Sequence, residues 1–181
     1  MRRKGILRIA AATAVLATLG GAAVFAQDKQ DKYSLKTPSG IAFSDFRGYE
    51  DWVVVSSTHT PNDRLKVMVA NPTMIKAYRA GIPGNGQPFP DGSKIVKLQW
   101  KIKKSAEAPF DANVPDTFAE VFLMQKDSKR FPDSGGWGYA VFNYDPATDR
   151  FTPTADLANC GHTCHVAVKA KNYVFHPYQK R

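Results

Sequence analysis

The chain has 181 residues, of which 43% are hydrophobic and 23% are charged, and this composition suits one globular domain with a modest core. Four basic residues of the N-terminal leader contribute to the formal net charge of +9, which leaves +5 for the rest of the chain. Basic and acidic residues are mixed along that remainder, and its one dense basic run is KIKK at 101–104. This pattern argues against a nucleic-acid partner, which would require a stripe of Lys and Arg with interleaved aromatic residues.

Residues 1–26 have the pattern of a cleavable export signal. A basic start, RRK, is followed by an apolar run and by small residues that end at Ala26. Gly20 and Gly21 interrupt the apolar run, which is short for a spanning helix, so an uncleaved membrane anchor is the weaker alternative. We therefore predict a periplasmic protein with no membrane span after cleavage, in a compartment that permits disulfides and in which c-type haem is attached.

The rest of the chain predicts a flexible lead-in over 27–40 and a single domain over 41–181. The lead-in is polar throughout. Strand-like runs rich in β-branched and aromatic residues are expected at 51–57, 65–70, 93–104, 118–126 and 137–145. The stretch 145–153, DPATDRFTP, is expected to be a turn.

A helix is expected over 71–81. Asn71 suits the N-cap, Pro72 the first helical position and Gly81 the left-handed stop. About five strands with two or three helices, and no internal repeat, predict an α+β domain built on an antiparallel sheet.

The segment 159–178 contains both cysteines and three of the four histidines of the chain. Cys160 and Cys164 are separated by three residues, and His165 follows at once. A c-type haem needs two thiols for its vinyl groups and a histidine for its iron, and the usual spacing is C-x-x-C-H, which is one residue shorter. We expect the extra residue to be absorbed as a bulge, which Gly161 would make easier.

Two other interpretations of this segment stay open on the residues alone. An exported pair of cysteines often forms a disulfide, although a loop this short gives a Cys160–Cys164 bridge little entropic stabilisation. A metal such as zinc would accept Cys160, Cys164, His162 and His165 as ligands. The motif favours haem over the disulfide, and the disulfide over the metal.

Three stretches resemble the cytochrome P-460 family, in the same order along the chain. They are DGSKIVKLQW at 91–100, MQKDSKRFPDSGGWGYAVF at 124–142, and the cysteine–histidine segment that ends in YVFHPY. The resemblance implies a cytochrome P-460-like fold and one covalently held haem c. It implies that Cys160 and Cys164 are the thioether sites and that His165 is the proximal iron ligand, although the C-x-x-x-C-H spacing departs from the family pattern.

The resemblance also implies residues for the reactive side of the haem. Members that oxidise hydroxylamine have a bond from a lysine to the haem ring, and the matching position after the Asp-Gly pair is Lys97. Strand alternation alone instead makes the face of Ile95, Lys97 and Gln99 a solvated one. The strand at 118–126 is where the distal residues of the family fall, and alternation there puts Phe118, Glu120, Phe122 and Met124 on one face. Glu120 would be a candidate base, and Phe122 a wall of the distal pocket.

The function expected from the resemblance is the binding or oxidation of a small nitrogen compound, hydroxylamine or nitric oxide, at a five-coordinate haem iron. A periplasmic electron acceptor and a homodimer are implied in the same way. The alternatives are a non-catalytic gas-binding or electron-transfer protein of the cytochrome c′-beta type, and a haem-free exported domain with a Cys160–Cys164 disulfide.

Overall fold

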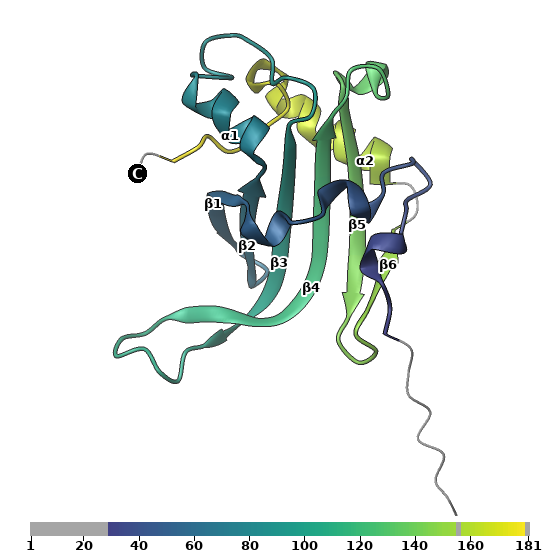
Figure 1. Ribbon diagram of the computed structural model, residues 1–181. Helices are drawn as coiled ribbons and strands as arrows, with labels where there is room; N and C mark the ends of the chain where they lie inside the picture. The colour runs from purple at the N-terminus through teal and green to yellow at the C-terminus, as the bar shows by residue number, and fades with distance from the viewer. Residues whose placement is uncertain (1–28, 155–156, 180–181) are drawn as a thin grey trace, which may run out of the picture.

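The computed structural model describes residues 29–154 and 157–179, so the predicted export signal lies outside the described residues. Six antiparallel strands form one sheet, and their order in the sheet is their order in the chain (Figure 1). They are β1 (Val53–Thr60), β2 (Arg64–Ala70), β3 (Lys94–Lys104), β4 (Asn113–Lys126), β5 (Trp137–Asp145) and β6 (Arg150–Pro153). The predicted α+β class with an antiparallel sheet is confirmed.

In the part of the chain that the structure describes, two α-helices and five short 3-10 helices accompany the sheet. They are α1 (Pro72–Arg79), α2 (Leu157–His165), η1 (Lys32–Ser34), η2 (Phe43–Phe46), η3 (Tyr49–Asp51), η4 (Pro132–Ser134) and η5 (Val166–Lys171). Asn71 caps α1 as predicted, because its side chain accepts a hydrogen bond from the backbone N–H of Met74. None of the helices in the described residues is long and apolar enough to cross a membrane.

Strand β6 lies where the sequence predicted only a turn. Its four residues pair with the end of β5, and Phe151 packs against the buried cluster on one face of the sheet. The strand is short and ends in Pro153, which is tolerated because β6 is the edge of the sheet. A run of four residues carries too little alternation to be recognised as a strand.

Residues 29–40, the described part of the segment expected as a flexible lead-in, instead pack largely on the domain. The side-chain amide of Gln30 exchanges two hydrogen bonds with the backbone of Phe151, so it covers the edge strand β6. Tyr33 and Leu35 pack against the buried cluster, and Lys32 forms a 2.6 Å ion pair with Glu50. The polar composition of this segment concealed the two apolar side chains that attach it.

The two faces of the sheet are covered by different parts of the chain. The N-terminal segment crosses one face and buries Phe43 and Phe46 against Val96, Val121 and Phe142 (Figure 1). On the other face, Met68, Ile95, Met124 and Tyr139 pack with α1 and with residues of the C-terminal segment. The chain therefore folds as one sheet between two covers. We call the segment that contains η1 to η3 the N-terminal cover, and the segment that contains α2, η5 and residues 173–178 the C-terminal cover.

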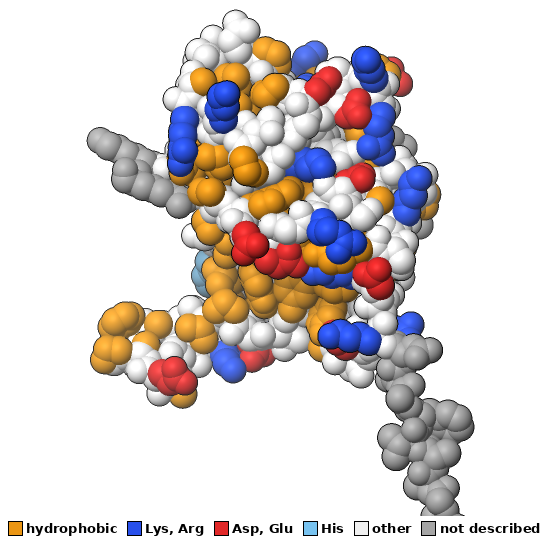
Figure 2. Space-filling model, in the orientation of Figure 1, with side chains coloured by type: hydrophobic (Ala, Val, Ile, Leu, Met, Phe, Trp, Pro, Cys, Tyr) orange, Lys and Arg blue, Asp and Glu red, His pale blue; other side chains and the backbone are white. Residues whose placement is uncertain are grey.

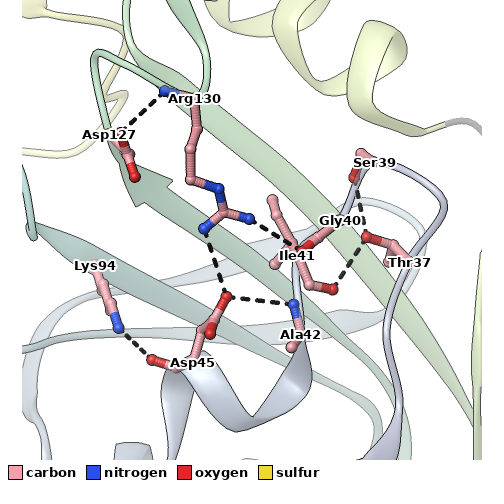
Figure 3. Close-up of polar contacts among 9 residues, drawn as sticks. All are labelled: Thr37, Ser39, Gly40, Ile41, Ala42, Asp45, Lys94, Asp127 and Arg130. Carbon is pink, nitrogen blue, oxygen red and sulfur yellow. Dashed lines mark hydrogen bonds and ion pairs between the residues drawn. The ribbon is translucent and has the colours of Figure 1, made fainter.

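Arg130, in the turn between β4 and β5, attaches the N-terminal cover to the sheet (Figure 3). Its guanidinium donates to the carbonyl oxygen of Gly40 at 3.0 Å and lies 3.8 Å from the carboxylate of Asp45. Lys94 of β3 donates to the carbonyl oxygen of Asp45. Lys94 and Arg130 thus attach the N-terminal segment to the face of the sheet opposite to Lys97, and their role is structural.

A bulge in β4 changes the predicted side-chain pattern. Gln99 pairs with Glu120, but Trp100 pairs with Phe118, so Ala119 is an extra residue on β4. Phe118 consequently turns to the face under the N-terminal cover, where its ring contacts Trp100 and neighbouring aromatic rings. The expectation that Phe118 shares a face with Glu120 is wrong for this reason.

The outer ends of β3 and β4 extend beyond the body of the molecule as a curved two-stranded ribbon (Figure 1). Phe110 at its tip is 72% exposed. Figure 2 shows apolar side chains at this tip, and basic and acidic side chains interspersed over the same face of the body.

Candidate functional site

A cavity of about 470 Å³ lies between the sheet and the C-terminal cover. Side chains of β1 to β5 form one wall, and α2 together with residues 174–176 forms the other. The volume falls within the range of pockets that hold drug-sized ligands and cofactors, about 300–1,000 Å³. Cys160, Cys164 and His165 all line it.

Helix α2 presents the two cysteines to the cavity. It runs from Leu157 to His165 and so continues through the extra residue of the C-x-x-x-C-H motif. The expectation of a bulge is wrong. Cys160 and Cys164 are four residues apart and therefore lie on the same face of the regular α-helix. Both Cys160 and Cys164 carry free, exposed thiols.

The helix disfavours the disulfide alternative. The Cβ atoms of residues four apart on a helix are about 5–6 Å from each other, whereas a disulfide needs about 3.5–4.5 Å. A bridge between Cys160 and Cys164 would therefore require the helix to distort.

His165 is oriented by a hydrogen bond to the backbone. Its Nδ1 lies 2.6 Å from the carbonyl oxygen of Tyr173. A carbonyl oxygen can only accept, so Nδ1 carries the proton and Nε2 keeps a free lone pair. The rings of Phe175 and Tyr139, with centroids 4.8 Å and 5.0 Å away, hold the imidazole from its sides. Burial lowers the pKa of His165, which favours the neutral form that metals bind.

His162 lies in a different environment. It is absent from the described cavity lining, and its ring centroid is 5.6 Å from that of Tyr173 and 6.3 Å from that of Tyr139. Among residues 29–154 and 157–179, no three His, Cys, Asp or Glu side chains gather as metal ligands. The metal alternative that required His162 beside both cysteines therefore has no support in the geometry.

Lys97 lies on the sheet wall of the cavity. Its Nζ is 3.5 Å from the ring centroid of Phe122, its cross-strand partner on β4. Burial lowers the pKa of Lys97 to about 8, and the neighbouring charge of Lys66 acts in the same direction. The solvated face predicted from alternation is wrong, because α2 and residues 174–176 cover it.

Of the two distal candidates, Phe122 lines the cavity and Glu120 does not. Glu120 is on the same face of the sheet, one cross-strand row further along, and its carboxylate accepts a hydrogen bond from Gln99 Nε2.

Sequence reasoning missed Lys66, Tyr139 and His176, which also line the cavity. The register of β2 against β3 pairs Lys66 with Gln99 and so puts Lys66 on the face of Lys97. That register cannot be derived from the sequence of either strand alone.

Gly161 allows α2 to approach the sheet closely. A Cβ atom at this position would lie 2.7 Å from the Cβ of Tyr139, a distance that real Cβ atoms essentially never show. Gly161→Ala should therefore destabilise the protein by about 1–3 kcal/mol through overpacking. In an exposed helix, replacement of glycine by alanine would instead raise the free energy of unfolding by about 1 kcal/mol. Urea unfolding decides between the two, and a gain in the free energy of unfolding would show that α2 is not packed as described.

The residues of the cavity fit a haem. Two thiols on one helical face, a histidine with a free Nε2, and an apolar wall with Met68, Phe122 and Val141 are the groups that such a cofactor requires. The family model for Cytochrome P460 matches residues 46–176, which is most of the chain. A search of the curated proteins returned no match. The chain, with its antiparallel sheet and its cysteine–histidine helix, belongs to the cytochrome P460 family of haem-binding cytochromes.

Proposed function

We propose that this protein is an exported, periplasmic cytochrome that holds one haem c through thioether bonds from Cys160 and Cys164, with His165 as the iron ligand. The observation that carries the proposal is the hydrogen bond from His165 Nδ1 to the carbonyl of Tyr173, beside two free thiols on the same cavity. The bond fixes the tautomer and the ring orientation, and it raises the basicity of Nε2. When bound, the haem supplies an iron that takes small ligands and exchanges electrons.

The ligand we propose is a small nitrogen compound, nitric oxide or hydroxylamine, with a periplasmic protein as the electron acceptor. Met68, Phe122 and Met124 make the sheet wall largely apolar, and such a wall suits a small neutral molecule. A homodimer is part of the same proposal.

Intact mass tests the attachment. After acid–acetone extraction, the polypeptide should keep the mass of one haem, on a chain that begins at Gln27. Haem that extracts cleanly would contradict the covalent proposal. The variants Cys160→Ala and Cys164→Ala should each keep the haem through the remaining thioether, with one vinyl group left unsaturated in the pyridine haemochrome spectrum. A variant with the same number of vinyl groups as the wild type would identify a thiol that takes no part.

Nitric oxide binding is favoured over hydroxylamine oxidation by the position of Glu120. Oxidation of hydroxylamine removes protons as well as electrons, and a positioned base contributes about 10²–10⁴-fold to such a step. Glu120 is outside the described lining and is engaged by Gln99. We therefore expect slow hydroxylamine turnover with an artificial electron acceptor, and stoichiometric binding of nitric oxide.

The matched variants are Glu120→Gln and, as a control, Glu107→Gln, which changes an exposed carboxylate before the tip of the β3–β4 ribbon. Both should turn over hydroxylamine at the wild-type rate to within about twofold. A 100-fold loss confined to Glu120→Gln would contradict this prediction and make Glu120 the catalytic base.

A further inference from the structure

Basic side chains line the cavity without a lining carboxylate to balance them. Lys66, Lys97 and His176 line it, and no Asp or Glu does so among the described residues. Within the part of the chain that the structure describes, none of these three side chains forms an ion pair or a hydrogen bond, and the Lys97 amine lies over the ring of Phe122. These basic groups are therefore available to a ligand.

The three groups act on one another through the cavity. Burial lowers the pKa of Lys97 and that of His176; the charge of Lys66 adds to the first shift, and the charges of Lys97 and Lys171 add to the second. Such effects require separations of a few ångströms in a poorly solvated space. Glu120, the acidic residue on this face, raises the pKa of Lys97 in opposition, but its carboxylate is already engaged by Gln99. A ligand that brings negative charge would offset the cost of burying the Lys97 ammonium and would favour the protonated form of His176.

Lys66 and the cysteines lie toward different edges of the sheet wall, whereas Lys97 on β3 is close enough to Cys164 to interact with it electrostatically. Lys66 is on β2, whereas α2 packs on β5 through the contact of Gly161 with Tyr139. Three strand spacings separate β2 from β5, which is about 14 Å at about 4.8 Å for each spacing. His176 is fixed on the C-terminal wall, because its carbonyl oxygen accepts a hydrogen bond from the hydroxyl of Tyr78 at 3.0 Å.

A haem has its two vinyl carbons on one side of the macrocycle and its two propionate carboxylates on the other. The thiols that would take the vinyl side are at the β5 end of the cavity. Lys66 is on β2, and His176 is held by Tyr78 of α1, the helix that follows β2 in the chain. We propose that Lys66 and His176 form a carboxylate-binding site that pairs with the haem propionates. This inference rests on the proposed function. A small oxyanion such as nitrite is a second source of the same chemistry.

The test uses the haem-loaded protein and three variants that each replace one basic side chain with glutamine. Lys66→Gln and His176→Gln change the proposed site, and Lys76→Gln removes an exposed positive charge from α1 as the control. The resonance Raman band of propionate bending reports the hydrogen bonding of the carboxylates without requiring turnover. It should shift in Lys66→Gln and in His176→Gln and stay in place in Lys76→Gln, with haem content and circular dichroism unchanged in all three.

A nitrite titration distinguishes the two sources. A several-fold loss of nitrite affinity in Lys66→Gln, with the propionate band unmoved, would support the anion site but assign it to a free oxyanion. An unmoved band together with an unchanged nitrite affinity in both site variants would overturn the inference. A wild-type chain that carries no haem would instead contradict the proposed function, and the nitrite titration would then still decide whether the basic site exists.

Discussion

His165→Ala should lose the native iron spectrum, whereas His162→Ala should largely keep it. His165 lines the cavity with its Nδ1 donating to the carbonyl of Tyr173, so its Nε2 is the nitrogen available to an iron. His162 is not in the described lining and lies between the rings of Tyr139 and Tyr173. The absorption spectra of the oxidised and reduced proteins measure the difference directly.

Added imidazole provides the control for this pair. A ligand-sized space remains beside α2 in His165→Ala, so free imidazole should restore a spectrum close to that of the wild type. Stability is followed separately by urea unfolding, because His162→Ala removes packing between two buried tyrosines. The opposite result, a lost spectrum in His162→Ala and a retained one in His165→Ala, would mean that the extra residue of the motif makes His162 the ligand.

The sequence predicted most of the sheet because its strands carry strong local signals. The β5 boundaries matched the structure at Trp137 and Asp145, and β3 began one residue later than expected. Strand β4 began five residues earlier, at Asn113, because Pro115 and Asp116 weakened its alternation. The strand β6 was missed because it is formed by pairing with β5 rather than by its own four residues.

The site was predicted in its parts but not in its arrangement. Cys160, Cys164 and His165 are close together in the sequence, so the motif was sufficient to predict that they share one site, and all three line the cavity. The face of Lys97 was identified correctly, but its burial was not, because its cover comes from residues more than sixty positions later. The bulge at Ala119 shows the same limit, since register is a property of two strands and alternation is a property of one.

Lys97→Arg should abolish any bond between the protein and the haem ring while keeping the positive charge. Only a neutral amine is a nucleophile, and the Lys97 pKa of about 8 leaves about half of this amine neutral at pH 8. An ordinary lysine would have about one molecule in 300 neutral at that pH. An arginine stays protonated at every accessible pH, so Lys97→Arg separates the role of the charge from that of the nucleophile.

The bond would replace one N–H and one ring C–H by N–C, releasing two protons and two electrons, so it needs a two-electron oxidant such as a peroxide or dioxygen. Wild type, Lys97→Arg and the control Lys76→Arg are therefore compared before and after treatment with peroxide, by absorption spectrum and by the mass of the haem-bearing peptides. We expect the Lys97 peptide to be joined to the haem in wild type and in Lys76→Arg only.

The rate of bond formation should fall by about 50-fold between pH 8 and pH 6, because the pKa of Lys97 is about 8 and the neutral fraction falls from about one half to about 1%. The rate falls toward low pH because the neutral amine, which is the reactive form, becomes protonated as the pH falls through the pKa of Lys97. A Lys97→Arg spectrum identical to that of the wild type in every oxidation state, before and after peroxide, would show that no such bond forms. The buried amine, held on the ring of Phe122, would then act in this cavity as a cation alone.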